Sequence, residues 1–462
     1  MATHERMASV DALWFHMEEP ANLMMITAVL FFEGKVDFER LRDHTRTRLV
    51  DRYPRFRQRV VPGLLGAPQW EEALDLDLDA HLLRLPVPAP GDRAAQEALV
   101  SEWMSTPLDR SRPLWQFHVL EGARGGDILL ARLHHCISDG IALARLLLSL
   151  TDGEVTDAEA PRERTRAPSS GLERWMRGAR AVAGTARTVL RKGAELVAEP
   201  ILAGDLVRQG ALSAAALGKL MVISPDPRTP LRGPLGTQKR AAWSSPIPLE
   251  RVKVLGRALG GTVNDVLLAV LTGALRRYLE ARNVPPEDLH ALVPVNLRPL
   301  DEPIPRDLGN RFGLVFLRLP VHLEDPRRRL AELSRRMGLV KKSPEAVVTF
   351  GALGLLGYTP APVERAVVDA FGMKASLVAT NVPGPRQPVS LAGVTLRELT
   401  FWVPQAGHLG LGVSLFSYAG QVTMGVAADV LRVPDPHVLI QNFHEELDAL
   451  SEAATPGVEG AA

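Results

Sequence analysis

The chain has 462 residues, 46% of them hydrophobic and 23% charged, and its 54 Lys and Arg residues nearly balance its 53 Asp and Glu residues. This composition is typical of a globular protein and excludes a mainly disordered chain. The length predicts two domains or two halves of one large domain. A net charge of +1 supplies no long-range field for a polyanion, so we expect no nucleic-acid partner.

Cysteine content and apolar runs bear on the compartment. The single cysteine, Cys136, excludes an intrachain disulfide and argues against a thiolate metal cage. The stretch His4–Arg6 breaks the apolar run that a signal peptide would need, so we expect a cytoplasmic protein. The longest uncharged stretch, 399–428, is interrupted by several glycines, and it predicts two buried strands around a turn near residues 419–420 rather than a membrane span.

Apolar runs that alternate with helical patterns predict a mixed α/β core. Strands are expected at Ile26–Phe32, Ile128–Leu133, Leu289–Val295, Phe312–Leu319 and Ser376–Thr380. Helices are expected at Phe38–Arg52, Ile141–Leu150, Leu249–Leu259, Pro326–Leu339 and His437–Leu450. Thr262 followed by Asp265 has the spacing of an N-terminal capping pair, and helical spacing then continues to Arg282.

The composition changes between residues 151 and 243, where polar and Pro- and Gly-rich segments flank a helical pattern that starts at Gly171. We therefore expect a first half at 1–150, a linker at 151–243 and a second half at 244–462. Within the linker, residues 162–192 carry nine basic and two acidic side chains beside an apolar stripe that includes Trp175. Such a helix either lies on an anionic membrane surface or packs its stripe on the protein itself.

The strongest chemical signal is LLARLHHCISDGIALARLLLSL at residues 129–150. A strand leads into His134 and His135, Asp139 and Gly140 close a turn, and an apolar helix follows. A neutral imidazole at a buried turn is suited to take a proton from an attacking hydroxyl or thiol. We expect Asp139 to orient this loop, through a buried pairing with an arginine such as Arg298.

Three other interpretations of this turn deserve comparison. Adjacent His134 and His135 point in different directions on extended backbone, and no HExxH partner or cysteine cluster accompanies them, so a zinc site is disfavoured. Cys136 directly follows His135, and the same divergence argues against a Cys–His nucleophilic dyad. A pair of core histidines without function is the third alternative. The sharing of one turn by two histidines, an aspartate and a glycine argues for function instead.

The segment HHCISDG at 134–140 resembles the HHxxxDG motif of CoA-dependent acyltransferases, in the form found in bacterial wax ester synthase/diacylglycerol acyltransferases. Three further segments resemble motifs of that family: RPLWQFHVLEG at 112–122, TVNDVLLA at 262–269 and ATNVPGPRQP at 379–388. The opening SVDALWFHMEEP, the VPVNLRP strand and GNRFG at 309–313 follow in the expected order. The resemblance therefore covers nearly the whole chain.

This resemblance implies a fold of two α/β halves like chloramphenicol acetyltransferase, with a tunnel between them and the helical linker joining them. It implies an O-acyltransferase that moves a long acyl chain from acyl-CoA to a fatty alcohol or diacylglycerol. The products would be wax esters or triacylglycerol, with acyl-CoA as a co-substrate and neither a metal nor another cofactor. His135 would be the general base, His134 would support it, and Asp139 and Gly140 would shape the turn.

Two further motifs of the resemblance have a structural alternative. Pro113, Leu114 and Trp115 would line the acyl channel, but a Trp after Pro-Leu is equally suited to fill the core. Asn264 and Asp265 would contact substrate, although short polar residues in the first turn of a helix commonly cap it.

The C-terminal segment supplies two more candidates. Thr380 and Asn381 are expected to contact the oxyanion or the acceptor, with the rigid bend at Pro383–Pro385 setting their direction. Arg298 has two other possible roles, which are to hold a phosphate of CoA or to cap the end of a strand. The family often has a Met-His pair where this chain has Met24-Met25, and this departure leaves the acceptor alcohol open.

Two other functions remain open at this point. A condensation-type acyltransferase would use the same histidine turn with a different acceptor, supplied by neighbouring carrier modules. A non-catalytic lipid-binding protein would keep the tunnel without the reaction, and the presence of His135 and Asp139 counts against it. The expected lipid substrates predict a peripheral location on the inner membrane face or on lipid droplets.

Overall fold

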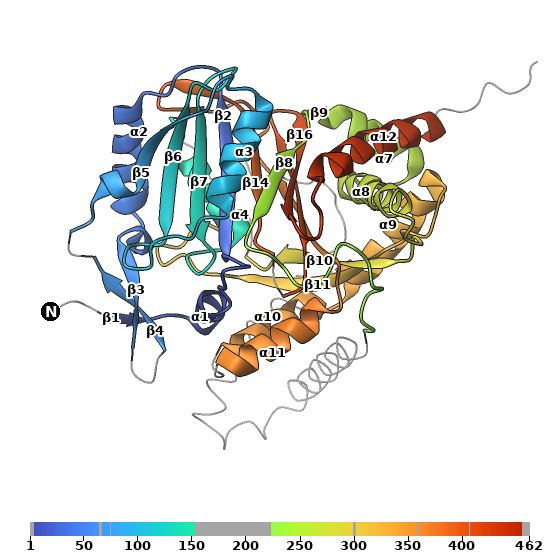
Figure 1. Cartoon of the computed structure of the whole chain (residues 1–462), viewed down its shortest axis with the longest axis horizontal. Coiled ribbons are helices and arrows are strands. Elements are labelled where there is room, and N and C mark those ends of the chain that lie inside the picture. Colours follow the sequence, from blue (N-terminus) through green and yellow to red (C-terminus); the bar gives the residue numbers. More distant parts are fainter. Residues whose placement is uncertain are drawn as a thin grey trace, which may run out of the picture.

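The computed structural model describes residues 4–454 apart from 64–66, 74, 153–222, 299–301, 358, 360 and 406. The chain has a mixed α/β fold with two main sheets that lie next to each other (Figure 1). The linker helix predicted from Gly171, with the basic stretch 162–192, lies outside the described residues. Its two interpretations therefore stay open.

The first sheet has the strand order β13-β14-β2-β7-β6-β5. Its neighbouring strands are antiparallel, except that β5 and β6 are parallel. Every residue of β2 and β7 is buried, which agrees with their continuous apolar sequences and shows that both faces of the sheet are covered. The strands are β2 (Met25–Phe32), β5 (Leu82–Pro86), β6 (Trp115–Glu121), β7 (Ile128–His134), β13 (Ser390–Leu391) and β14 (Val394–Trp402).

Helices and a small sheet surround the first sheet. A separate three-stranded sheet has the order β1-β4-β3. The predicted helix at Phe38–Arg52 is confirmed as helical to Val50, where an α-helix passes into a π-helical segment. The elements are β1 (His4–Arg6), β3 (Gln58–Pro62), β4 (Pro68–Glu72), α1 (Ser9–His16), α2 (Phe38–His44), the π-helical segment Thr45–Val50, the 3-10 turns Pro54–Phe56 and Leu78–Ala80, α3 (Arg93–Met104) and α4 (Gly140–Ser149).

The second sheet has the order β11-β10-β12-β15-β16-β8, and β9 also pairs with β16. β10, β12 and β15 are parallel neighbours, and the other pairs are antiparallel. The strands are β8 (Lys239–Trp243), β9 (Ile247–Pro248), β10 (Leu289–Asn296), β11 (Phe312–Leu319), β12 (Leu377–Pro383), β15 (Leu411–Tyr418) and β16 (Gln421–Asp429).

The division into halves differs from the predicted boundaries in two respects. β8 belongs to the second sheet, so the second half begins at Lys239 or earlier rather than at residue 244. β14 comes from the C-terminal half of the sequence but pairs with β2 of the first sheet. The second half thus contributes a strand to the first, a long-range pairing that no local pattern can indicate.

The helices of the second half cover the outer side of its sheet, with α7, α8, α9 and α12 grouped beside it in Figure 1. α10 and α11 form a helical pair at the lower edge of the molecule in that view. The helices are α7 (Leu249–Leu259), α8 (Val263–Glu280), α9 (Pro326–Lys342), α10 (Glu345–Leu356), α11 (Ala361–Gly372) and α12 (Pro436–Ala454).

Two local sequence predictions are confirmed by their hydrogen bonds and dihedral angles. The Thr262 side chain accepts from the Asp265 backbone N–H, and the Asp265 carboxylate accepts from the Thr262 backbone N–H, which completes a capping box for α8. β15 and β16 form the predicted hairpin, with φ of 46° at Ala419 and 77° at Gly420. Two consecutive positive φ angles produce a turn whose twist suits antiparallel strands.

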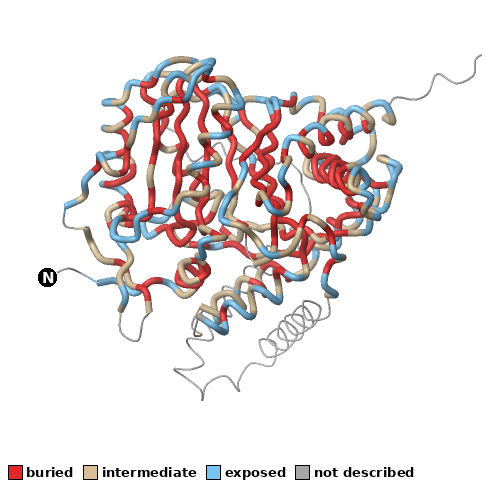
Figure 2. The backbone as a smooth tube through the Cα atoms, in the orientation of Figure 1, coloured by how far each residue is buried: buried red, intermediate tan, exposed pale blue. Residues whose placement is uncertain are grey.

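Figure 2 shows buried backbone concentrated in the two sheets and in α8. Within the described residues, no single helix combines the length and the apolar character that crossing a bilayer requires. α7 and α8 meet those requirements only when they are taken together, and they are bent by 95° relative to each other.

Candidate active site

The histidine turn lies at the end of β7, between the two neighbouring strands of the first sheet. The His134 N–H donates to Leu114 O at 2.9 Å and the His135 N–H donates to Met24 O at 2.7 Å. Asp139 is the N-cap of α4, since its Oδ1 accepts from the Ala142 N–H at 2.9 Å. Backbone hydrogen bonds on both sides therefore hold the turn, and Gly140 begins the helix.

The His135 ring is almost completely covered. Trp14 of α1 stacks on it with ring centroids 4.5 Å apart and planes 18° apart, and Phe312 of β11 lies 5.5 Å away. His135 is 5% exposed, and burial lowers the pKa of its imidazole to about 4. The ring is consequently neutral at pH 7.

Asn310 determines which ring nitrogen of His135 carries the proton. Its amide nitrogen Nδ2 donates to Asp11 Oδ1 at 2.8 Å and to His135 O at 2.7 Å, which leaves its amide oxygen facing His135 Nδ1 at 2.9 Å. An amide oxygen only accepts hydrogen bonds, so Nδ1 carries the proton and Nε2 keeps a lone pair. None of the described residues forms a hydrogen bond with that Nε2.

Asp11 completes this chain of hydrogen bonds from α1. Its Oδ1 also accepts from the Asn310 backbone N–H at 2.9 Å. Burial raises the pKa of the Asp11 carboxyl to about 6, although the two hydrogen bonds from Asn310 act in the opposite direction. An acidic group, an amide and an imidazole are thus connected in series.

The neighbouring His134 is occupied by other contacts. Its Nδ1 accepts from the Cys136 N–H at 3.1 Å, and its Nε2 lies 2.9 Å from Glu18 Oε2. Burial alone would raise the pKa of Glu18, but His134 and Arg110 outweigh this effect and lower it. Burial also raises the pKa of the Cys136 thiol, which disfavours a thiolate nucleophile. His134 therefore has no free nitrogen for proton transfer.

The predicted pairing of Asp139 with Arg298 is not found among the described residues. Asp139 Oδ2 accepts from the Arg311 backbone N–H at 3.1 Å, while Arg298 Nη2 donates to Gly309 O at 3.3 Å. Burial lowers the pKa of Arg298, and the Asp139 charge only partly offsets this. The Ala142 N–H and the Arg311 N–H instead each donate to one of the two carboxylate oxygens of Asp139.

The same turn joins the two halves of the chain. The Gly309 N–H donates to Ile137 O at 3.0 Å, and Ser138 Oγ donates to Gly309 O at 3.3 Å. Gly309 has a φ of +87°, and a Cβ there would lie 3.2 Å from Asp11 Oδ2. A glycine is required at this position because the backbone is left-handed and the neighbouring carboxylate is close.

The Pro113, Leu114 and Trp115 segment lies mostly in the core. Trp115 is fully buried, donates from its indole Nε1 to Phe56 O at 2.8 Å, and stacks on His81. Leu114 is 1% exposed. Pro113 is buried as well, although it lies at the wall of an open groove that also contains acidic and basic side chains. These positions match the packing alternative for Leu114 and Trp115.

The ND and NVPGP segments meet each other rather than the histidine turn. Asn381 Nδ2 donates to Asn264 Oδ1 at 2.9 Å, which places the Asn381 side chain on the face of β12 that α8 covers. The next residue back, Thr380, points to the opposite face because side chains alternate along a strand. Thr380 rather than Asn381 therefore stays the candidate for substrate contact. In the other segment, Asp265 caps α8.

Trp14 and Phe312 cover the His135 ring. A small cavity of about 40 Å³ does lie between the halves, and Met25 and Lys239 are among its lining residues. His135 does not line this cavity or the groove at Pro113.

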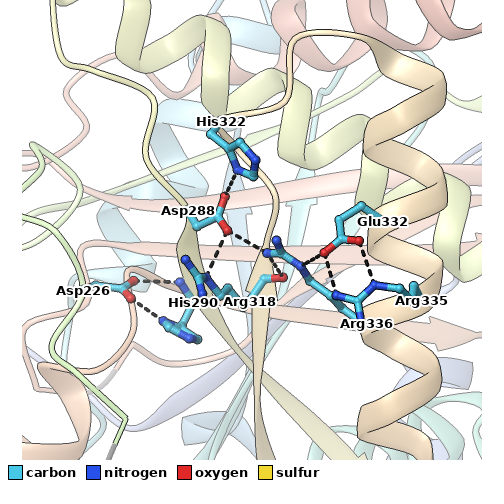
Figure 3. Close-up of polar contacts among 8 residues, drawn as sticks. All are labelled: Asp226, Asp288, His290, Arg318, His322, Glu332, Arg335 and Arg336. Carbon is cyan, nitrogen blue, oxygen red and sulfur yellow. Dashed lines mark hydrogen bonds and ion pairs between the residues drawn. The ribbon is translucent and has the colours of Figure 1, made fainter.

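A second group of titratable side chains fastens α9 and the segment around Asp226 to the edge of the second sheet (Figure 3). Asp288 accepts from Arg318 of β11 at 3.0 Å and from Arg336 of α9 at 2.9 Å. Asp226 accepts from the backbone and ring nitrogens of His290 at 2.8 and 2.5 Å. The remaining members of the group are His322, Glu332 and Arg335. Each carboxylate has a basic partner, so this group is structural.

Across the part of the chain that the structure describes, no three His, Cys, Asp or Glu side chains are placed to hold a metal ion. The turn itself offers one free imidazole nitrogen in a site from which water is largely excluded. Such a site suits proton transfer to and from a reacting group.

The comparisons with known proteins identify the class. The model of the wax ester synthase/diacylglycerol acyltransferase catalytic domain matches residues 7–267, and the model of the C-terminal domain of the same proteins matches residues 308–451. The chain therefore belongs to the wax ester synthase/diacylglycerol acyltransferase family, and it is an acyltransferase.

Particular relatives agree with this assignment. The probable diacylglycerol O-acyltransferase tgs1 of Mycobacterium tuberculosis strain H37Rv is 31% identical over 404 residues, covering 85% of this chain and 83% of that protein. The probable diacylglycerol O-acyltransferase tgs2 of the same strain is 29% identical over 472 residues, covering 96% and 98%.

Solved structures share the fold. The wax ester synthase/diacylglycerol acyltransferase of Marinobacter aquaeolei VT8 superposes with a TM-score of 0.69 at 24% identity, over 97% of this chain and 99% of that one. The first condensation domain of the calcium-dependent antibiotic synthetase gives 0.59 at 18% identity, over 100% and 97%. The expected mixed α/β fold is thus confirmed.

Three residues of the site were not singled out from the sequence. Asp11, Trp14 and Asn310 lie in SVDALWF and GNRFG, two segments that supported the resemblance without a role for any side chain. An aspartate within an apolar helix and an asparagine after a glycine are usable signals of buried polar contacts. Their partner could not be named, because it is supplied by a distant part of the chain.

Proposed function

We propose that this acyltransferase moves a long acyl chain from acyl-CoA to the hydroxyl of a diacylglycerol or a fatty alcohol, with His135 as the general base. The observation that carries the proposal is the neutral His135 ring, whose Nδ1–H is held by Asn310 and whose Nε2 is free of described partners. The names of the tgs1 and tgs2 relatives support diacylglycerol as acceptor, and the Marinobacter structure supports wax ester synthesis.

The reaction needs one base and no covalent enzyme intermediate. His135 Nε2 takes the hydroxyl proton as the alcohol oxygen attacks the thioester carbonyl carbon. The tetrahedral intermediate then expels the CoA thiolate, and the imidazolium returns its proton to that sulfur, giving an ester and free CoA. A low pKa keeps the imidazolium short-lived, which favours this second transfer.

The covered site protects the thioester from water. Trp14 and Phe312 shield the base in the present state, so substrate entry requires these rings to move. Thr380 is a proposed contact for the oxyanion or the acceptor. The lipid nature of both substrates supports peripheral contact with a membrane or a lipid droplet.

The function is tested by incubating the protein with radiolabelled palmitoyl-CoA and a panel of acceptors, namely hexadecanol, a 1,2-diacylglycerol and hexadecylamine, and separating the products by chromatography. Labelled ester with the two alcohols is expected. Product with the amine alone would indicate the condensation-type alternative, and release of palmitate alone would refute acyl transfer.

The base is tested by His135→Gln, with His118→Gln as the matched control. Both histidines are buried in the first half, since His135 directly follows β7 and is 5% exposed, and His118 on β6 is 0% exposed. We expect His135→Gln to lower turnover by roughly 10²- to 10⁴-fold, the usual contribution of a general base, while His118→Gln changes stability only. Equal turnover in the two variants would remove His135 from this role.

A further inference from the structure

Exposed apolar side chains gather in one stretch of the chain. Among the described residues, six large apolar side chains are exposed, and four of them lie between residues 339 and 373. These four are Leu339 at 59%, Leu355 at 73%, Val363 at 47% and Met373 at 44%. Isolated exposed apolar residues are ordinary, but such a concentration indicates a surface that is covered in use.

α10 and α11 lie within this stretch and carry Leu355 and Val363, while Leu339 is on α9 and Met373 directly follows α11. Apart from Glu345 at its start, the sequence of α10 contains no charged residue. Figure 1 shows the two helices projecting from the lower edge of the molecule, and Figure 2 shows that most of their backbone is only partly buried or exposed. We call residues 339–374 the apolar edge.

Basic residues outnumber acidic residues within the apolar edge, and most of its acidic side chains are buried. The stretch contains four basic residues, namely Lys341, Lys342, Arg365 and Lys374. Of its three acidic residues, Glu345 is 0% exposed and Glu364 is 1% exposed, which leaves Asp369 at the surface. The outward charge of the apolar edge is therefore positive.

The apolar edge is attached to the helix that covers the catalytic base. His16 at the end of α1 lies 3.0 Å from the buried Glu364 of α11, and Glu19 lies 3.5 Å from Arg365. α10 ends against the start of α1, where a Cβ on Gly357 would lie 1.9 Å from Ser9 O. The same α1 supplies Trp14, which stacks on His135.

We propose that the apolar edge is the surface by which this protein docks on an anionic lipid layer. Apolar side chains of this kind enter the boundary between headgroups and acyl chains, and lysines and arginines beside them attract anionic headgroups. A second copy of the chain is a poorer occupant, because it would bring two sets of the same basic residues together. The benefit for catalysis, delivery of lipid beside α1 and His135, rests on the proposed function.

Vesicle binding tests the docking surface without any need for activity. The full chain and the variant Leu355→Ser/Val363→Ser/Met373→Ser are sedimented with vesicles of phosphatidylcholine, with or without phosphatidylglycerol. The matched control is Val254→Ser/Leu431→Ser, which removes the two other exposed apolar side chains, at 50% and 61% exposure. We expect the partition coefficient to fall at least tenfold for the first variant and to stay unchanged for the control.

The contribution of the basic residues is tested separately with the variant Lys341→Gln/Lys342→Gln. Its control is Lys35→Gln, which removes an exposed lysine outside the apolar edge. Each cation near an anionic surface contributes roughly fivefold in binding, so the double variant should lose its preference for phosphatidylglycerol. The proposal would be overturned if the two control variants lost as much vesicle binding as the apolar-edge variants. It would also be overturned if both apolar-edge variants bound vesicles as well as the parent. Vesicle binding by His135→Gln distinguishes the two proposals, since docking does not depend on the base.

Discussion

Asn310 accepts a hydrogen bond from His135 Nδ1 at 2.9 Å, although 175 residues separate the two in the sequence. The same amide also donates to the backbone oxygen of His135 and to Asp11. One side chain therefore fixes both the direction of the imidazole and the nitrogen that carries its proton. It also ties the base of the first half to a loop of the second half.

Replacing Asn310 should separate catalysis from folding. In Asn310→Ala, His135 loses the acceptor for its Nδ1–H, and we expect kcat to fall roughly 10- to 100-fold through loss of orientation. The free energy of unfolding should fall by about 1–3 kcal/mol for a buried group left without a partner. Asn442→Ala, which removes a hydrogen bond to Ala274 O, is the matched control and should lose stability only.

The variant Asn310→Asp gives the same position a charge. A carboxylate facing Nδ1 stabilises the imidazolium and should raise the pKa of His135 above its present value of about 4. The acid limb of the kcat/KM profile should therefore move to higher pH. An unchanged acid limb would show that the imidazole does not titrate in the rate-determining step.

Asp11 should reduce stability at neutral pH while supporting catalysis. Its pKa is raised from 3.8 to about 6, so the folded protein holds a proton that the unfolded chain releases near pH 4. The free energy of unfolding consequently falls as pH rises from 4 to 6, by up to roughly 3 kcal/mol. Asp11→Asn keeps an oxygen for Asn310 and removes this cost.

We therefore expect Asp11→Asn to raise the urea midpoint at pH 7.5 and to match the parent only at about pH 3, below the unfolded pKa of 3.8. Its kcat should fall several-fold at pH 7.5, because the negative charge that favours a transient imidazolium is gone. A variant that is less stable than the parent at pH 7.5 would contradict the raised pKa of Asp11.

Trp14 should keep water and protons away from the base. In Trp14→Leu, solvent reaches the ring and the pKa of His135 should rise from about 4 toward its ordinary value of 6.5. The fraction of labelled palmitoyl-CoA that is hydrolysed rather than transferred should increase. Trp14→Phe retains an aromatic cover and should stay near the parent on both measures.

The contact between Asn264 and Asn381 is tested by a double-mutant cycle. Both side chains are replaced by alanine, singly and together, and the coupling in the free energy of unfolding is expected at about 0.5–1.5 kcal/mol. A structural role predicts this coupling with little change in KM. An increase in KM for Asn381→Ala without coupling would restore Asn381 as a substrate contact.

Local interactions made much of this fold predictable from the sequence. The capping box of Thr262 and Asp265, the Asp139 cap of α4 and the hairpin turn at residues 419–420 all involve groups within four residues of each other. The buried strands were indicated by continuous apolar runs. The histidine turn was identified for the same reason, because its strand, turn and helix are contiguous.

Only the tertiary structure decided what surrounds that turn. Asn310 contacts His135 across 175 residues and Asp11 across 299, and β14 crosses from the second half to pair with β2 of the first sheet. Such contacts depend on how two separately patterned halves dock, and local hydrogen bonds carry no information about that docking. A capping residue and its partner are a few residues apart, so the sequence alone predicts their contact. His135 and Asn310 are 175 residues apart, so their contact forms only when the chain between them has folded.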